Sequence, residues 1–195
     1  MEFATYNITL EQIVELIAVI FGLAYVVLAI RIHHWCWYMT LCSGGLFLWL
    51  FWSVELYLMS LLQIFFMGIA IYGLFKWNPN SKKLEKRITK IKPKNHLYIL
   101  SLIVLSSIII GWFLSQFTDD ALPYLDTVTT VASLATSWMV TKKILENWLY
   151  WIVIDAISIY IYIERGLYLT VLLFTIYLIM AALGYHQWKR SYRQQ

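Results

Sequence analysis

Charged residues are scarce in this chain of 195 residues. Asp, Glu, Lys and Arg together make up 13%, whereas 61% of the residues are hydrophobic and the mean hydropathy is +0.68. A water-soluble domain could not bury so much apolar surface. The apolar runs reach the roughly 20 residues that a helix needs to cross a bilayer, and they lack the alternation typical of barrel strands. The composition therefore predicts an all-α integral membrane protein.

Motifs that would indicate an enzyme or an ATP-driven pump are also missing. The two cysteines, Cys36 and Cys42, fall in one apolar run and form neither a CxxC pair nor a disulfide framework. There is no GxxxxGK[ST] phosphate-binding loop, and no two histidines are spaced i, i+4 on one helix face. We therefore expect no catalytic residues, no cofactor and no metal.

A cleavable signal segment is not evident either. The first residues, MEFATYNITLEQ, contain no basic region, and no small-residue cleavage site follows the first apolar run. We expect the first apolar helix to be retained in the protein and residues 1–195 to form a single membrane domain.

The apolar runs predict seven membrane-spanning helices. Their expected limits are about 12–30, 35–53, 56–76, 97–117, 122–141, 147–164 and 167–187. Between the third and fourth runs lies a polar basic linker, KWNPNSKKLEKRITKIKPKN. The positive-inside rule places this linker in the cytoplasm, so the N-terminus is expected outside and the C-terminus inside.

The distribution of basic residues agrees with this topology. Of the 15 Lys and Arg residues only Arg165 falls outside, whereas Glu55, Asp119, Asp120 and Glu164 fall in outer loops. The basic residues on the inner side are Arg31, Lys76, Lys82, Lys83, Lys86, Arg87, Lys90, Lys92, Lys94, Lys142, Lys143, Lys189, Arg190 and Arg193. The pI of about 9.0 is therefore a topology signal first, with anionic lipid headgroups as secondary partners. It does not indicate nucleic-acid binding.

A weak internal repeat appears when the chain is shifted by 111 residues. Residues 56–77 then align with 167–188 at eight identical positions of 22, among them the pairs Gly73/Gly184 and Trp77/Trp188. Three helices, a linker helix and three more helices would give two parallel triplets, an arrangement that transporters use to hold substrate between the repeats near the membrane midplane. We expect repeat one at about 10–77, linker and helix four at 78–120, and repeat two at 121–188.

One carboxylate, Asp155, lies near the middle of the sixth predicted span, where it costs roughly 2.5–3.5 kcal/mol. Trp148 and Trp151 share its helix face at i, i+3, i+7 spacing. No basic residue lies at matching depth to pair with it. An anion flanked by indoles suits a flat organic cation. The position aligned with Asp155 is Gly44, which provides either space for a ligand or close helix packing.

Other polar or aromatic residues lie in the predicted spans and are candidates for lining the same pocket. They are Trp37, Gln63, Tyr72, Trp138 and Tyr177. Glu15 and Asp126 are aligned by the repeat near the outer ends of spans one and five, and we expect them at the outer entrance as gate residues or as interfacial charges.

Several of these segments together resemble a known family of vitamin transporters. The stretch ENWLYWIVIDAISIYIYIERGLY followed by GYHQW, together with QIFFMGIAIYGLFKW and YLDTVTTVAS, is similar to the PnuC-type transporters, which carry nicotinamide riboside or thiamine. The resemblance covers nearly the whole chain. It implies a fold like that of full-length SWEET proteins, a bacterial inner-membrane location, and uptake by facilitated diffusion followed by intracellular phosphorylation that traps the vitamin.

The resemblance also bears on the substrate. Where the nicotinamide riboside branch tends to have asparagine, this sequence has Asp155 and Ala70, and the ending GYHQW is closer to the thiamine branch. Thiamine is therefore the expected substrate, with nicotinamide riboside as the alternative. A proton-coupled carrier of another small organic cation and a channel remain alternative mechanisms, and the sequence is compatible with a homo-oligomer.

Overall fold

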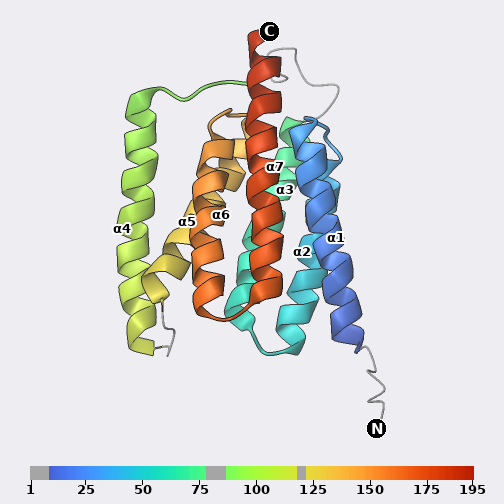
Figure 1. Ribbon diagram of the computed structural model, residues 1–195, viewed down its shortest axis with the longest axis vertical. Helices are drawn as coiled ribbons and strands as arrows, with labels where there is room; N and C mark the ends of the chain where they lie inside the picture. Colours follow the sequence, from blue (N-terminus) through green and yellow to red (C-terminus); the bar gives the residue numbers. More distant parts are fainter. Residues whose placement is uncertain (1–8, 78–86, 118–121) are drawn as a thin grey trace.

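The expected seven helices are all present. The computed structural model describes residues 9–77, 87–117 and 122–195, and these residues form helices joined by turns and short loops, with one isolated bridge (Figure 1). The helices are α1 (Leu10–Ile30), α2 (Cys36–Ser53), α3 (Tyr57–Lys76), α4 (Pro93–Phe117), α5 (Pro123–Thr141), α6 (Asn147–Glu164) and α7 (Tyr168–Arg193). The linker lysines 82, 83 and 86 and the aspartates 119 and 120 lie outside the described residues.

Two helices are longer than their apolar runs. α4 begins at Pro93 rather than at 97, because proline is well suited to the first turn of a helix. α7 continues to Arg193 rather than ending at 187, and its last turn carries Arg190 and Arg193, which interact favourably with the negative end of the helix dipole. Neither signal is part of a hydropathy pattern.

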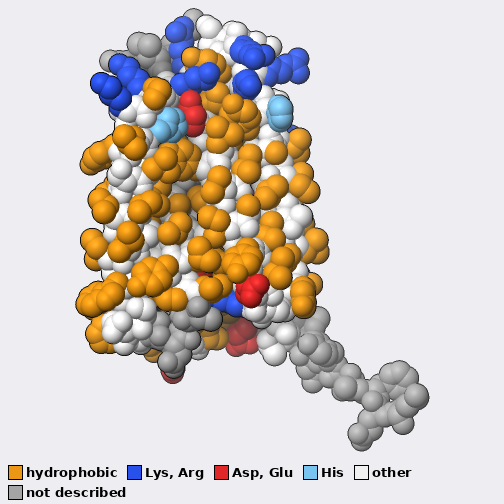
Figure 2. All heavy atoms as spheres, turned by 60° about the vertical axis from the view of Figure 1, so that its left-hand side comes forward, with side chains coloured by type: hydrophobic (Ala, Val, Ile, Leu, Met, Phe, Trp, Pro, Cys, Tyr) orange, Lys and Arg blue, Asp and Glu red, His pale blue; other side chains and the backbone are white. Residues whose placement is uncertain are grey.

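The outer surface is that of a membrane protein. Hydrophobic side chains cover the sides of the bundle, and Lys and Arg gather at the end that carries the C-terminus (Figure 2). By length and composition alone, four described helices could cross a membrane, namely α1, most of α3, α4 and α7. The other three helices, α2, α5 and α6, run beside them, and they bury polar side chains such as Ser43, Thr136 and Asp155 inside the bundle.

The helices pack as two triplets and one peripheral helix. α1, α2 and α3 contact one another in order, and so do α5, α6 and α7, whereas α4 packs mainly on α5 (Figure 1). The triplets meet where α1 lies against α7 and where α3 lies against α5. A shift of 111 residues exchanges these two contacts. Because α4 returns the chain across the bundle, α1 and α5 run in the same direction.

The turns repeat at the same offset. Four residues have positive φ angles: Ile32 (56°) and Lys143 (53°) follow the first helix of each triplet, and Glu55 (62°) and Gly166 (69°) follow the second. Each pair is separated by 111 residues. A positive φ is costly for a β-branched residue such as Ile32. The aligned residue Lys143 has a positive φ as well, so the two triplets share the same turn geometry. That the triplets superimpose as whole units, in a SWEET-like manner, stays a prediction.

Two glycines allow the second and third helices of each triplet to approach closely. A Cβ atom added at Gly73 would lie 2.4 Å from the ring of Trp37, and one added at Gly184 would lie 2.6 Å from the ring of Trp148. These two glycine–tryptophan pairs are also related by the offset of 111. Small residues at helix crossings are typical of membrane bundles, where packing replaces the hydrophobic effect as the force that holds helices together.

Candidate functional site

A cavity of about 380 Å³ lies between the two triplets. Six helices line it, and α4 contributes nothing. The lining residues are Gly22, Tyr25, Val26, Trp37, Thr40, Ser43, Phe47, Gln63, Phe66, Ile69, Ser133, Ser137, Trp148, Trp151, Asp155, Phe174, Tyr177 and Ala181. Several are aligned by the repeat, including Trp37 with Trp148. The volume is within the range of small-molecule sites.

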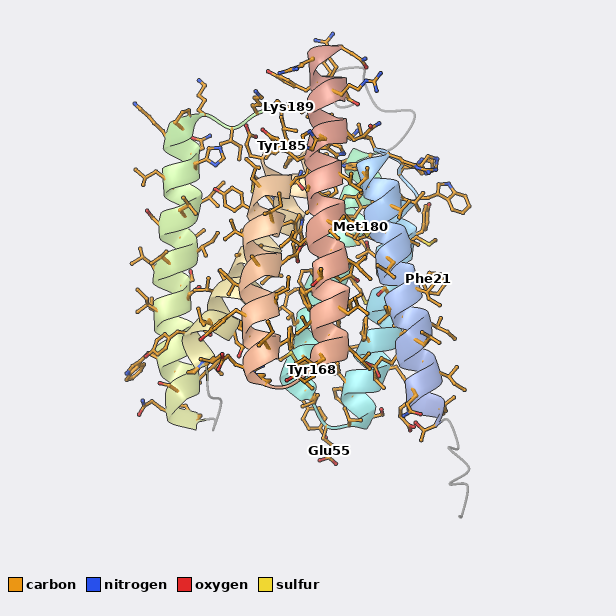
Figure 3. All side chains as sticks on the ribbon, viewed as in Figure 1. Phe21, Glu55, Tyr168, Met180, Tyr185 and Lys189 are labelled. Carbon is orange, nitrogen blue, oxygen red and sulfur yellow. The ribbon has the colours of Figure 1, made fainter. Side chains whose placement is uncertain are left out.

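The cavity lies at mid-height in the bundle and extends toward the basic end. Met180, at the middle of α7 in Figure 3, stands between the lining residues Tyr177 and Ala181. Tyr185 and Lys189 mark the basic end of the same helix, and Tyr168 marks the opposite end. This depth is the one at which transporters of this architecture hold substrate.

Asp155 is the one charged residue in the described lining of the cavity. Its side chain is 3% exposed, and within the described residues its carboxylate has neither an ion pair nor a hydrogen bond. An ionised carboxylate so enclosed is costly unless a positive group approaches it. The cavity that adjoins Asp155 is the route by which such a group can reach it.

Aromatic rings form most of the remaining wall. Trp151 is half-buried and lies one turn before Asp155 on α6, so its ring can contact a ligand beside the carboxylate. Phe174 and Tyr177 form an edge-on pair on α7, with ring centroids 5.9 Å apart. Trp37 and Trp148 also line the cavity, but they are only 1% and 3% exposed. Each ring is enclosed by its glycine and by neighbouring aromatic side chains, so little of it faces the cavity.

Polar side chains complete the wall. The sequence predicts one of them, Gln63, and does not predict the others. Ser43 donates a hydrogen bond to the Ala18 carbonyl at 2.8 Å, and Thr40 donates one to the Cys36 carbonyl at 3.2 Å. Gln63, Ser133 and Ser137 also line the cavity. Ser133 and Ser137 are spaced i, i+4 on α5, which places both on one helix face. That spacing was available in the sequence as a signal.

The structure does not place Tyr72 and Trp138 at the cavity, contrary to expectation. Both lie on the α3–α5 side near the basic end, and the Nζ atom of Lys142 lies 4.9 Å from the centroid of the Tyr72 ring and 5.6 Å from that of Trp138. The position of a residue along a helix does not determine which face of the helix its side chain occupies.

The two expected gate residues, Glu15 and Asp126, and Gly44 do not line the cavity. Asp126 forms an ion pair with Arg165 inside the second triplet, and Glu15 is exposed on α1. Neither lines the cavity, so a gate at this position stays a prediction. A Cβ atom added at Gly44 would lie 2.9 Å from the Cγ atom of Met67. Close packing, and not space for a ligand, therefore explains Gly44.

Comparisons with known proteins agree with a transporter architecture. A family profile described as nicotinamide mononucleotide transporter matches residues 12–190. Proteins named nicotinamide riboside transporter PnuC from Escherichia coli (strain K12) and Shigella flexneri are each 25% identical over 209 residues, which cover 93% of this chain and 87% of theirs. A crystal structure of the vitamin B3 transporter PnuC matches with a TM-score of 0.72 and 20% identity, over 93% of this chain and 82% of that one.

Proposed function

Because the chain belongs to the nicotinamide mononucleotide transporter family, we propose that it carries a small vitamin with a positively charged aromatic ring across the bacterial inner membrane. The single observation that supports this proposal most strongly is the position of the Asp155 carboxylate in the cavity wall. It is the one charged group in the described lining of a cavity whose other walls are aromatic or weakly polar. A cationic ring satisfies both features at once, by charge pairing and by cation–π contact.

The same observation argues against a phosphorylated substrate. The described lining of the cavity contains no Lys, Arg or His, although such side chains are the usual partners of phosphate oxygens. A mononucleotide would bring its phosphate into an apolar space that already holds a carboxylate. The unphosphorylated riboside leaves only the pyridinium charge, which Asp155 can pair with. The family description names the mononucleotide. We propose that this member of the family prefers the unphosphorylated riboside instead.

We infer that nicotinamide riboside is the first substrate to test. The two relatives named above are nicotinamide riboside transporters by name, and they favour this alternative over thiamine. Thiamine remains the second candidate because of Asp155, which resembles the thiamine branch. Ala70 no longer supports thiamine, since it is fully buried and does not line the cavity.

The roles of the residues follow from their places in the wall. Asp155 pairs with the ring cation, Trp151 stacks on the ring, and Gln63, Ser133 and Ser137 offer hydrogen bonds to the hydroxyl or amide groups of the vitamin. Facilitated diffusion with intracellular trapping is the proposed mode, as the family resemblance implies, and a proton-coupled carrier is the alternative. The basic end of the bundle is proposed to face the cytoplasm.

The test is a titration of the purified protein with nicotinamide riboside, thiamine and nicotinamide mononucleotide in parallel, followed by tryptophan fluorescence. We expect nicotinamide riboside to bind, and the mononucleotide to bind at least about tenfold more weakly because of its phosphate. Tighter binding of the mononucleotide would contradict the role given to Asp155. If thiamine bound more tightly than nicotinamide riboside, thiamine would become the proposed substrate.

A further inference from the structure

At its basic end the cavity is closed by four tryptophans, which we call the tryptophan cluster: Trp37, Trp77, Trp148 and Trp188. Trp37 meets Trp77 edge-on at a centroid distance of 5.3 Å, and Trp148 meets Trp188 edge-on at 5.5 Å. Trp77 and Trp188 lie 6.1 Å apart and join the two pairs. Because the pairs are related by the offset of 111, each triplet supplies one half of the closure.

Two hydrogen bonds join the halves across the triplets. The indole N–H of Trp77 donates to the Thr141 carbonyl at 3.1 Å, and that of Trp188 donates to the Ala29 carbonyl at 3.0 Å. Trp37 and Trp148, in contrast, have buried indole N–H groups with no partner among the described residues. A vitamin that leaves through this end requires the triplets to separate here, which would break both bonds.

A segment of the linker covers this closure, and we call Ile88–Ile91 the linker segment. Ile88 is 2% exposed and belongs to the same buried cluster as the four tryptophans. The Thr89 N–H donates to the Lys143 carbonyl at 3.0 Å, and the Leu145 N–H donates to the Thr89 carbonyl at 2.9 Å. The N–H of Ile91 donates to the Glu146 carboxylate at 3.3 Å. The linker segment is therefore held on the α5–α6 turn of the second triplet.

Among the described residues, no segment covers the first triplet in this way. Its α1–α2 turn has the same backbone form, with Ile32 aligned to Lys143. In the described part of the chain the bridge between Thr89 and Ile144 is an isolated one, and nothing similar reaches the α1–α2 turn. Trp35, which aligns with Glu146, is 54% exposed. The two halves of a nearly symmetric closure are thus held unequally.

We propose that the linker segment is a latch: Ile88 fills the tryptophan cluster and holds the basic end of the cavity closed, and it must leave the cluster each time that end opens. The proposal rests on the transport function proposed above, because only a transporter needs this end to open. The linker segment would thus help to determine how often the cavity opens toward the basic side.

The test uses a cysteine in the cavity as a reporter of opening. Ser137→Cys, in a chain with Cys36→Ser and Cys42→Ser, is labelled by a membrane-impermeant cationic thiol reagent applied to either face of oriented vesicles. We expect Ile88→Ala to raise the labelling rate from the basic side by about fivefold or more, because the closed state loses a buried side chain. Labelling from the opposite side should not rise.

Ile91→Ala is the matched control, since this isoleucine belongs to the same segment but not to the tryptophan cluster; it should change neither rate. Ile88→Val removes one methylene and should give a smaller rise, about twofold, on the same side. Unchanged labelling in both Ile88 variants, or an equal rise from both sides, would overturn the latch. Binding of nicotinamide riboside to the wild-type protein is measured separately, so its absence would contradict the proposed function while leaving the latch result intact.

Discussion

Asp155 is the residue on which the account of the site depends most. Replacing it by asparagine preserves the shape of the side chain and removes its charge. We expect the affinity for nicotinamide riboside to fall by about 10- to 150-fold, which corresponds to the roughly 1.5–3 kcal/mol of a hydrogen bond to a charged group. Titration of the purified variant, followed by tryptophan fluorescence, measures this change.

The control for this prediction is the reduced riboside, whose ring carries no charge and which should bind the wild-type protein and Asp155→Asn about equally. Trp151→Leu should cost less, about 0.5–2 kcal/mol, because only the cation–π contact is lost. If Asp155→Asn folded normally and bound nicotinamide riboside as tightly as the wild-type protein, the carboxylate would be a structural group.

At the scale of the helices, the packing of tryptophan on glycine gives a sharp prediction. A Cβ atom at Gly184 would lie 2.6 Å from the Trp148 ring, and that ring is held between helices and cannot easily move away. Gly184→Ala should therefore destabilise the protein by about 1–3 kcal/mol. Thermal unfolding of the purified protein in detergent measures the effect, and Gly73→Ala should behave in the same way because of Trp37.

Gly45→Ala is the matched control, since a Cβ atom there would meet no heavy atom within 4 Å. Alanine in a helix interior is favoured over glycine by up to about 1 kcal/mol, so this variant should unfold at the same temperature or slightly higher. Equal unfolding temperatures for Gly184→Ala and Gly45→Ala would show that the α6–α7 crossing is looser than these distances indicate.

The helices themselves could be predicted from the sequence because a bilayer imposes a length and a composition on each of them. The offset of 111 also anticipated that Gly73 and Gly184 occupy equivalent places. The side-chain environment was harder to predict. Tyr72 and Trp138 lie on helix faces that do not line the cavity, whereas Ser133 and Ser137 do line it, although serine has little weight in a hydropathy scale. Such faces are fixed by contacts between helices, which one sequence does not display.

At the scale of the whole molecule, the charge distribution predicts the orientation. Lys and Arg gather at the end that carries the C-terminus, and Glu55 projects from the opposite end (Figures 2 and 3). We expect Glu55→Cys, in a chain otherwise free of cysteine, to react with an impermeant maleimide added to intact cells, and Arg193→Cys to react only after the membrane is opened. Labelling of Arg193→Cys in intact cells would reverse the orientation.

Uptake of radiolabelled nicotinamide riboside into proteoliposomes, with no ion gradient and with empty liposomes in parallel, tests the central claim most directly. We expect the wild-type protein to bring the internal concentration to the external one and no further, and Asp155→Asn to do so at least about tenfold more slowly at concentrations below saturation. Accumulation only when a pH gradient is applied would favour the proton-coupled alternative. Uptake no faster than into empty liposomes, by a protein that is folded and correctly inserted, would contradict the claim that this chain carries nicotinamide riboside.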